Sequence, residues 1–266
     1  MAEERWSPAG VDLTTPNTAR IYDYLLGGKD NYAADREVAE QLLAVIPEAR
    51  TAARENHAFV GRAVRHLAGR GVRQFIDVGS KLPAAGNVHE VAAEVAPDAT
   101  VVFADGDPVV LVHARALLAG TERTTVVQCD LTHPETLADD PTVREHIDFS
   151  EPVAIVLDRV LHFIRDTAAA TETVRRLHEA LPPGGHLVFT HITHEPQPES
   201  SKDVTEVFKP TWHFWGRTRA EVEALVAPFE LLDPGLTYTP LWRPEPGAAI
   251  AHPERTFTLA GVGRRV

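Results

Sequence analysis

The sequence predicts an α/β protein built on a mostly parallel sheet with helices on both faces. Five short runs rich in β-branched residues recur between residues 72 and 192, separated by stretches with helical periodicity. Apolar strands that alternate with helices are typical of parallel sheets whose two faces are both covered. In such sheets ligands bind at the carboxyl ends of the strands, so a functional site is expected there.

The five strands are expected at 72–79, 99–105, 124–130, 152–158 and 185–192. The tail from about 195 to 266 is expected to form a C-terminal cap with two further edge strands, which gives a seven-stranded sheet. Three of the first four strands end on a carboxylate, and one ends on a glycine turn. These strand-end residues are Gly79, Asp105, Asp130 and Asp158.

The bulk composition restricts the class of function. The chain has 266 residues, 44% hydrophobic residues and a formal net charge of −12. This negative charge argues against nucleic-acid and anionic membrane partners, because both attract lysine and arginine. The single cysteine, Cys129, gives neither a disulfide framework nor a thiolate metal cluster. The polar start and the lack of an apolar run of transmembrane length predict a cytoplasmic protein.

The turn after the first strand argues against two common nucleotide-binding motifs. It reads Gly79-Ser80-Lys81-Leu82-Pro83-Ala84, without the G-x-G-x-x-G that a dinucleotide pyrophosphate requires. The segment "LGGKD" is not a P-loop, because the earlier glycine and the Ser/Thr after lysine are both missing. Asp105, at the end of the second strand, is placed to accept hydrogen bonds from ribose hydroxyls. A nucleoside without a pyrophosphate therefore fits the strand ends.

Several segments resemble a known family. "FIDVGS", "FADGDP", "QCD" and "LPPGGHLVF" resemble the Rossmann-like class I fold of S-adenosylmethionine (SAM)-dependent methyltransferases. "ARIYDYLLGGKDNYAADREVAEQL" and "GLTYTPLWRPE" are similar to an actinobacterial SAM-methyltransferase-like family first catalogued as a domain of unknown function. The resemblance extends from about residue 12 to 262, and it implies SAM as cofactor or substrate.

The resemblance also implies roles for individual residues. Gly79 and Ser80 would contact the methionine part of SAM through their backbone. Asp105 would hold the ribose, Gly106 would leave room for the adenine, and Asp130 would bond the adenine amino group.

Two nearby polar residues are expected to cap helices instead. Asp107 directly precedes Pro108, which is the usual arrangement of an N-cap and the first helical residue. Asn87 and Glu90 form the N-x-x-E pattern of a capping box.

Two positions depart from the family pattern, and both introduce charge at the ligand end of the sheet. The family has glycine at the position of Lys81, and small apolar residues where this chain has Asp158-Arg159. Three roles stay open for Lys81: a solvated loop residue, a cation that holds the SAM carboxylate or Asp158, or a side chain that excludes SAM. Arg159 is the other candidate to clamp that carboxylate.

The predicted function is that of a SAM-dependent methyltransferase acting on an unknown small molecule, in secondary metabolism. An alternative is an enzyme that uses SAM as its sole substrate, in which Cα attacks Cγ. That reaction gives 1-aminocyclopropane-1-carboxylate and 5′-methylthioadenosine, and extra charges around the methionine arm favour it. A third alternative is a non-catalytic regulator that binds SAM or a nucleoside. The oligomeric state stays open.

The candidate proton acceptors are Asp158, His162, Tyr22, Tyr24 and Tyr32, of which the first three are favoured. His162 follows the fourth strand, where acceptor-facing residues often lie in this fold. His191 and His194 have the spacing of a weak metal motif, but no third ligand has suitable spacing, so no metal is expected.

The N-terminal segment is expected to cover the site. Residues 1–14 are a flexible arm, 15–71 a helical lid and 72–266 the SAM-binding α/β domain. The stretch "RIYDYLLGGKDNY" combines a helix, a glycine turn and three tyrosines, and could close over the sheet edge and exclude water. Its lid residues are Tyr22, Gly27, Gly28 and Asn31, of which Asn31 is expected to contact the cofactor. The aromatic residues Trp212, Phe214 and Trp215 either wall an acceptor pocket or pack in the C-terminal cap.

Overall fold

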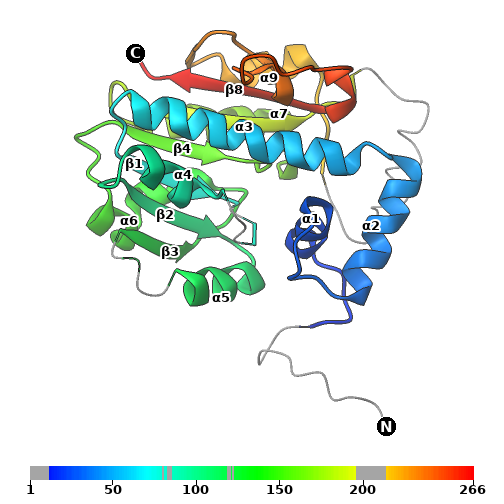
Figure 1. Cartoon of the computed structure of the whole chain (residues 1–266). Helices are drawn as coiled ribbons and strands as arrows, with labels where there is room; N and C mark the ends of the chain where they lie inside the picture. The colour runs from blue at the N-terminus through cyan, green and yellow to red at the C-terminus, as the bar shows by residue number, and fades with distance from the viewer. Residues whose placement is uncertain (1–11, 80, 83–85, 119–120, 122, 196–213) are drawn as a thin grey trace.

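The computed structural model describes residues 12–79, 81–82, 86–118, 121, 123–195 and 214–266 (Figure 1). Its centre is an eight-stranded sheet with the order β3-β2-β1-β4-β5-β8-β6, and β7 also pairs with β8. The strands are β1 Gln74–Val78, β2 Thr100–Asp105, β3 Thr124–Gln128, β4 Val153–Leu157, β5 His186–Ile192, β6 Glu230–Leu231, β7 Thr237–Tyr238 and β8 Thr258–Arg264.

The five strands predicted between residues 72 and 192 are confirmed as β1 to β5. They pair in parallel, whereas β8 runs antiparallel to β5. The order of the strands reverses at β1, whose neighbours are β2 on one side and β4 on the other. A crevice outside the carboxyl ends at such a reversal is the usual ligand site of an open α/β sheet.

The prediction of seven strands is wrong by one because the edge strand is interrupted. β6 and β7 pair with different parts of β8, and β5 occupies the other edge of β8 along its whole length. Between β6 and β7 the chain turns through Pro234 and Gly235, with the Gly235 N–H bonded to the Leu232 carbonyl at 2.8 Å. Proline has no N–H for the ladder, so one edge strand becomes two short ones.

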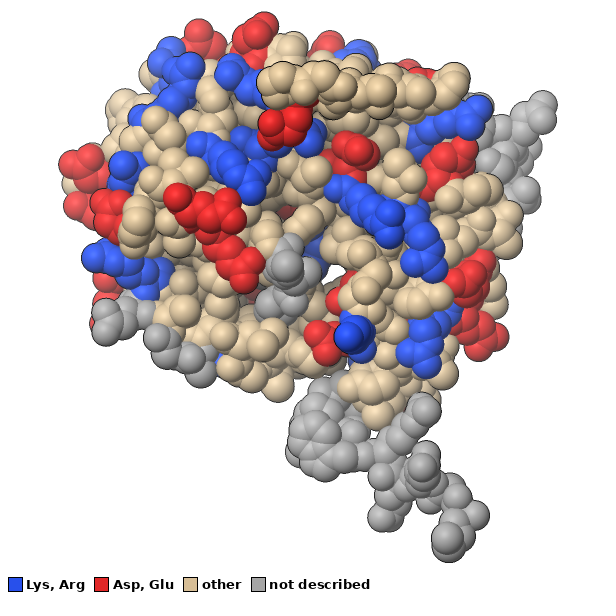
Figure 2. Space-filling view, in the orientation of Figure 1, with Lys and Arg blue, Asp and Glu red and all other residues tan. Residues whose placement is uncertain are grey.

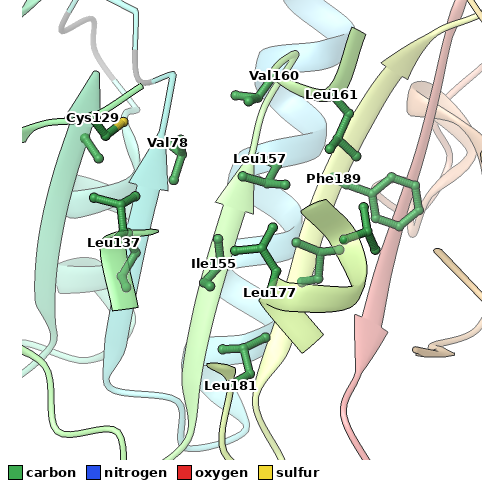
Figure 3. Packing of buried hydrophobic residues seen from close by; sticks show 14 of the residues in the cluster. Val78, Cys129, Leu137, Ile155, Leu157, Val160, Leu161, Leu177, Leu181 and Phe189 are labelled. Carbon is green, nitrogen blue, oxygen red and sulfur yellow. The ribbon is translucent and has the colours of Figure 1, made fainter. Parts of the chain in front are cut away.

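Each face of the sheet is covered by its own layer of helices. Along β4, Val153, Ile155 and Leu157 join the cluster on one face, while Ala154 and Val156 join the cluster on the other. This alternation follows from the two-residue period of a strand. Figure 3 shows residues of the first cluster, among them Leu157 from β4 and Leu177 from α7 (Thr167–Ala180). The helices are α1 Thr18–Leu26, α2 Ala33–Val45, α3 Ala49–Gly69, α4 Val88–Val95, α5 Pro108–Leu117, α6 Pro141–His146, α7 Thr167–Ala180 and α9 Arg219–Val226, with short 3-10 helices η1 Pro134–Asp139, η2 Leu161–Phe163, η3 Thr239–Leu241 and η4 Pro253–Thr256.

Helices α1 and α2 lie beyond the carboxyl ends of the parallel strands (Figure 1). The Asn17 side chain caps α1, and Gly27 ends it in the left-handed conformation with φ 89°. α3 belongs to two layers: Ala49 and Ala53 pack with α1 and α2, and its later turns pack on the sheet. The prediction of a lid over 15–71 therefore concerns α1, α2 and the first turns of α3.

The surface and the helix lengths add two observations. Acidic and basic side chains are interspersed over the face seen in Figure 2, so the excess negative charge is not gathered there. In the part of the chain that the structure describes, no helix is both long and apolar enough to cross a membrane.

Candidate active site at the strand ends

Gly79, which directly follows β1, lies against the loop after β4. Gly79 has φ +70°, and a Cβ atom there would lie 2.7 Å from Cγ2 of Val160. Its N–H donates to the Ala104 carbonyl at 2.9 Å, which ties the loop to the end of β2. A side chain at this position would therefore meet both backbone strain and a steric clash.

Two adjoining hollows lie along the strand ends. The first has a volume of about 210 Å³ and is lined by α1, α5 and the ends of β1, β2 and β4. The second lies at the ends of β2 and β3, and Leu131 lines both. Six predicted residues line the first hollow, namely Tyr22, Gly79, Lys81, Asp105, Asp158 and Arg159. Gly106 and Asp130 line the second, whereas Ser80 lies outside the described residues.

Lys81 forms an ion pair with Asp158, one of the roles considered for it from the sequence. Asp158 is 3% exposed and also accepts hydrogen bonds from Asn56 Nδ2 at 2.8 Å and Thr190 Oγ1 at 2.7 Å. Burial raises the pKa of Asp158, but the Lys81 ammonium and the other donors outweigh it and hold that pKa below its usual value. Burial lowers the pKa of Lys81, and Asp158 reverses that effect so that the pKa is raised. Both partners are therefore charged at neutral pH.

Lys81 and Arg159, two cations that line the first hollow, share an unusual backbone conformation. Their φ angles are +60° and +64°, in the left-handed region that favours glycine. The Arg159 N–H donates to Thr190 Oγ1 at 2.9 Å, so Thr190 fixes both Asp158 and the residue after it. Such conformations cost on the order of 1–3 kcal/mol each and cluster at functional sites.

Tyr22 brings helix α1 into the same group of residues. Its ring lies 4.8 Å from Lys81 Nζ and 4.6 Å from Arg159 Cζ. Its hydroxyl donates to the Ala53 carbonyl at 2.9 Å and accepts from Asn56 Nδ2 at 3.1 Å. The aromatic face of Tyr22 is therefore directed at the two cations, and the hydroxyl is bonded to α3.

Asp105 is buried at the end of β2. It is 5% exposed, and its Oδ1 accepts from the Asp107 N–H at 2.8 Å. Burial raises the pKa of Asp105 to about 6. The predicted N-cap role of Asp107 is confirmed, because its Oδ1 accepts from the Val109 N–H at 2.8 Å. The other oxygen of Asp107 accepts from Asn17 Nδ2, which connects α1 to α5.

The second hollow is lined by Gly106 and Asp130, the two residues predicted to contact adenine. A Cβ atom on Gly106 would lie 3.0 Å from the Cys129 carbonyl, so a side chain there would crowd this hollow. Asp130 is exposed, and its Oδ1 accepts from the N–H and hydroxyl of Thr132 at 2.8 and 2.6 Å. The Thr132 bonds lower the pKa of Asp130, so it is an anionic acceptor.

Two predicted site residues do not line either hollow. His162 is 1% exposed and packs against Phe163 and Phe214, with ring centroids 4.7 and 6.0 Å away. Burial, reinforced by Arg159, holds the pKa of His162 well below its ordinary value. Asn31 lies in the turn between α1 and α2, where its Nδ2 donates to Asp23 at 2.8 Å. Their catalytic and cofactor-binding roles stay predictions.

The predicted capping box at the start of α4 is wrong. Asn87 is the N-cap residue, but its side chain makes no capping bond to the helix. Glu90 instead accepts from the Gly86 N–H at 2.7 Å, one residue earlier than a capping box requires. Glu90 therefore fixes the loop that precedes α4.

Sequence reasoning missed three polar residues that contribute to the site. Asn56 and Thr190 hold Asp158 from 102 and 32 residues away, so no local signal could reveal them. Asp77 is buried in β1, and burial raises its pKa to about 7 while Lys81 opposes the shift. An aspartate within the apolar run "FIDVG" was the signal that could have identified it.

A buried arginine, also missed, fixes the loop after β4. Arg217 is 2% exposed and donates to the Ile164 carbonyl at 2.8 Å and to His191 Nε2 at 2.9 Å. His191 is thus engaged with Arg217, and its Nδ1 lies 2.7 Å from the Ile192 carbonyl. Within the described ranges, no three His, Cys, Asp or Glu side chains are grouped so that they could hold a metal ion. Trp212 lies outside the described residues.

The strand order is that of a class I methyltransferase fold. The chain belongs to the family described as S-adenosyl methyltransferase, which it matches over residues 4–266. A candidate methyltransferase from Thermobifida fusca is 40% identical, with a TM-score of 0.90 over 98% of this chain and 99% of its own. A DUF574-family protein from Streptomyces avermitilis is 36% identical, with a TM-score of 0.90 over 96% and 99%.

A more distant structure supports the fold alone. The N-methyltransferase NodS from Bradyrhizobium japonicum, in complex with S-adenosylhomocysteine, is 15% identical, with a TM-score of 0.51 over 92% of this chain and 98% of its own. A search of curated proteins finds no match to this chain.

Proposed function

We propose that the protein binds SAM along the two hollows and transfers its methyl group to a small-molecule acceptor in secondary metabolism. The observation that carries the proposal is a row of glycines and polar side chains at the ends of adjacent strands, which suits the successive parts of a SAM molecule. Asp130 and Gly106 lie in the hollow at β3 and β2, Asp105 at the end of β2, Gly79 after β1 and Asp158 after β4. We expect the adenine, the ribose and the amino-acid arm of SAM to lie along these groups in this order, because ligands of open α/β sheets bind outside the carboxyl ends of the strands.

The residues present fit this ligand. Gly106 leaves the adenine hollow open, and Asp105 offers a buried carboxylate to two ribose hydroxyls. Gly79 allows the backbone to approach the ligand closely. SAM supplies an electrophilic sulfonium methyl group, and the protein contributes mainly proximity and a line of attack.

We propose that Asp158 positions groups instead of removing a proton. Three donors hold its carboxylate and its pKa is lowered, so it binds a proton poorly at neutral pH. The ring of Tyr22 would face the cationic part of the ligand. Residues 15–71 would act as the lid, and the bond between Asn17 and Asp107 supports this because it joins α1 to the body at the rim of the site.

One observation favours the alternative in which SAM is the sole substrate. Lys81, Asp158 and Arg159 gather charge at the end of the site where the amino-acid arm would lie. Cyclisation needs that arm held firmly, whereas methyl transfer does not depend on it.

The test is to incubate the purified protein with SAM, with and without a panel of small nucleophiles, and to identify the products by mass spectrometry. S-adenosylhomocysteine and a methylated acceptor support the proposal. 5′-Methylthioadenosine and 1-aminocyclopropane-1-carboxylate, formed without an acceptor, support cyclisation. Binding of SAM without either product contradicts both and leaves a non-catalytic regulatory role.

A further inference from the structure

Three elements converge on the side chain of Lys81. Its ammonium pairs with Asp158 at the end of β4 and lies 4.8 Å from the ring centroid of Tyr22 on α1, while its backbone belongs to the loop after β1. The side chain is 19% exposed and lines the first hollow. Lys81 therefore spans the end of the site that is nearest to β4.

The environment of this ammonium is that of a bound ligand cation. A carboxylate and an aromatic face are the two groups with which proteins commonly bind ammonium ligands. Asn56 and Thr190 orient the Asp158 carboxylate by hydrogen bonds of 2.8 and 2.7 Å, so this acceptor is fixed in advance. In the structure Lys81 occupies that acceptor as a cation tethered to the chain.

The two hollows differ in volume and in lining. The first measures about 210 Å³ and the second about 490 Å³. Gly106 and Asp130 line the second hollow, Asp105 lines the first, and Lys81 and Asp158 line only the first. The Lys81 side chain therefore lies in the smaller hollow, at its β4 end.

We propose that Lys81 determines which ligands the site accepts, by occupying the subsite for the amino-acid arm. An adenine nucleoside without a charged arm binds directly. SAM binds when its own ammonium replaces that of Lys81 at Asp158, so that Asp158 stays paired throughout. This inference rests on the proposed function, because it takes the strand ends to be a SAM site.

Calorimetric titration with two probes, SAM and 5′-methylthioadenosine, tests the inference. The variant Lys81→Gly removes the occupying side chain, and glycine adopts φ +60° without strain. It should bind SAM about tenfold or more tightly than the parent protein, with 5′-methylthioadenosine affinity unchanged within about twofold. Lys29→Met, on the exposed turn after α1, is the matched control and should change neither affinity.

A second variant removes the charge of the Asp158 carboxylate itself and shows whether a change in SAM binding comes from a folding defect. Asp158→Asn should weaken SAM binding and leave 5′-methylthioadenosine binding unchanged, which also shows that the nucleoside end is folded. Weaker SAM binding by Lys81→Gly would mean that the lysine holds the SAM carboxylate. An unchanged ratio of the two affinities would mean that the lysine does not discriminate between the two ligands. Each result overturns the inference. If neither probe binds the parent or Lys81→Gly, the proposed function itself fails.

Discussion

Replacing Asp158 by alanine tests how strongly the pair with Lys81 stabilises the fold. Removing one partner of a buried ion pair typically costs about 3–5 kcal/mol. Because the Lys81 side chain is 19% exposed and can turn toward the hollow, we expect about 2–3 kcal/mol for the lost charge pairing. Thr190 also loses the acceptor for its hydroxyl, which adds on the order of 1 kcal/mol. The total expected loss in the free energy of unfolding is about 3–4 kcal/mol.

The double variant Asp158→Ala/Lys81→Gly tests how much of this loss comes from the Lys81 ammonium that is left without its carboxylate. It removes the unpaired ammonium and also relieves the left-handed backbone of residue 81, which costs about 1 kcal/mol or more in a non-glycine residue. The double variant should therefore be more stable than Asp158→Ala by about 1–2 kcal/mol. Urea unfolding followed by circular dichroism gives all four free energies of a double-mutant cycle. A double variant no more stable than Asp158→Ala would refute the reasoning, because the lysine would then not depend on its partner.

Three further predictions concern the ribose contact, the glycine turn and the dependence of stability on pH. Asp105→Ala should lower the affinity for both SAM and 5′-methylthioadenosine by well over tenfold in calorimetry, because charge-assisted bonds to the ribose are lost. Unchanged affinity would contradict the assignment of Asp105 to the nucleoside. Gly79→Ala should lower the free energy of unfolding by roughly 1–3 kcal/mol in urea, because its Cβ would lie 2.7 Å from Val160 Cγ2 at a φ of +70°. Burial lowers the pKa values of His186 and His191 to about 4. Below pH about 6.5 the unfolded state therefore binds more protons than the folded state. The contribution of the two histidines to the free energy of unfolding is complete above that pH and is lost as the pH falls toward 4, by up to about 1.4 kcal/mol per pH unit for each histidine. His186→Gln should flatten this loss in urea unfolding at pH 4 to 7, and an unchanged slope would contradict the assignment.

The local signals in the sequence were sufficient for most elements of the fold. β-Branched runs gave β1 to β5, and the Asp107-Pro108 pair gave the start of α5, because both depend on residues close together in the chain. The same signals failed at the edge strand and at Asn87. In both places a neighbouring turn and its bonds, rather than the residue pattern, decide the geometry.

The sequence by itself determined that carboxylates follow consecutive parallel strands at one edge of the sheet, because parallel strands all end at the same edge. Only the tertiary structure decided how the charges are used. Lys81 reaches across 77 residues to Asp158, and Asn56 across 102. Neither contact has a local signature, and the left-handed backbone of Lys81 and Arg159 is one that their residue types disfavour. Such pairings arise only when the packed chain brings distant groups out of water together, where a buried charge must find its partner.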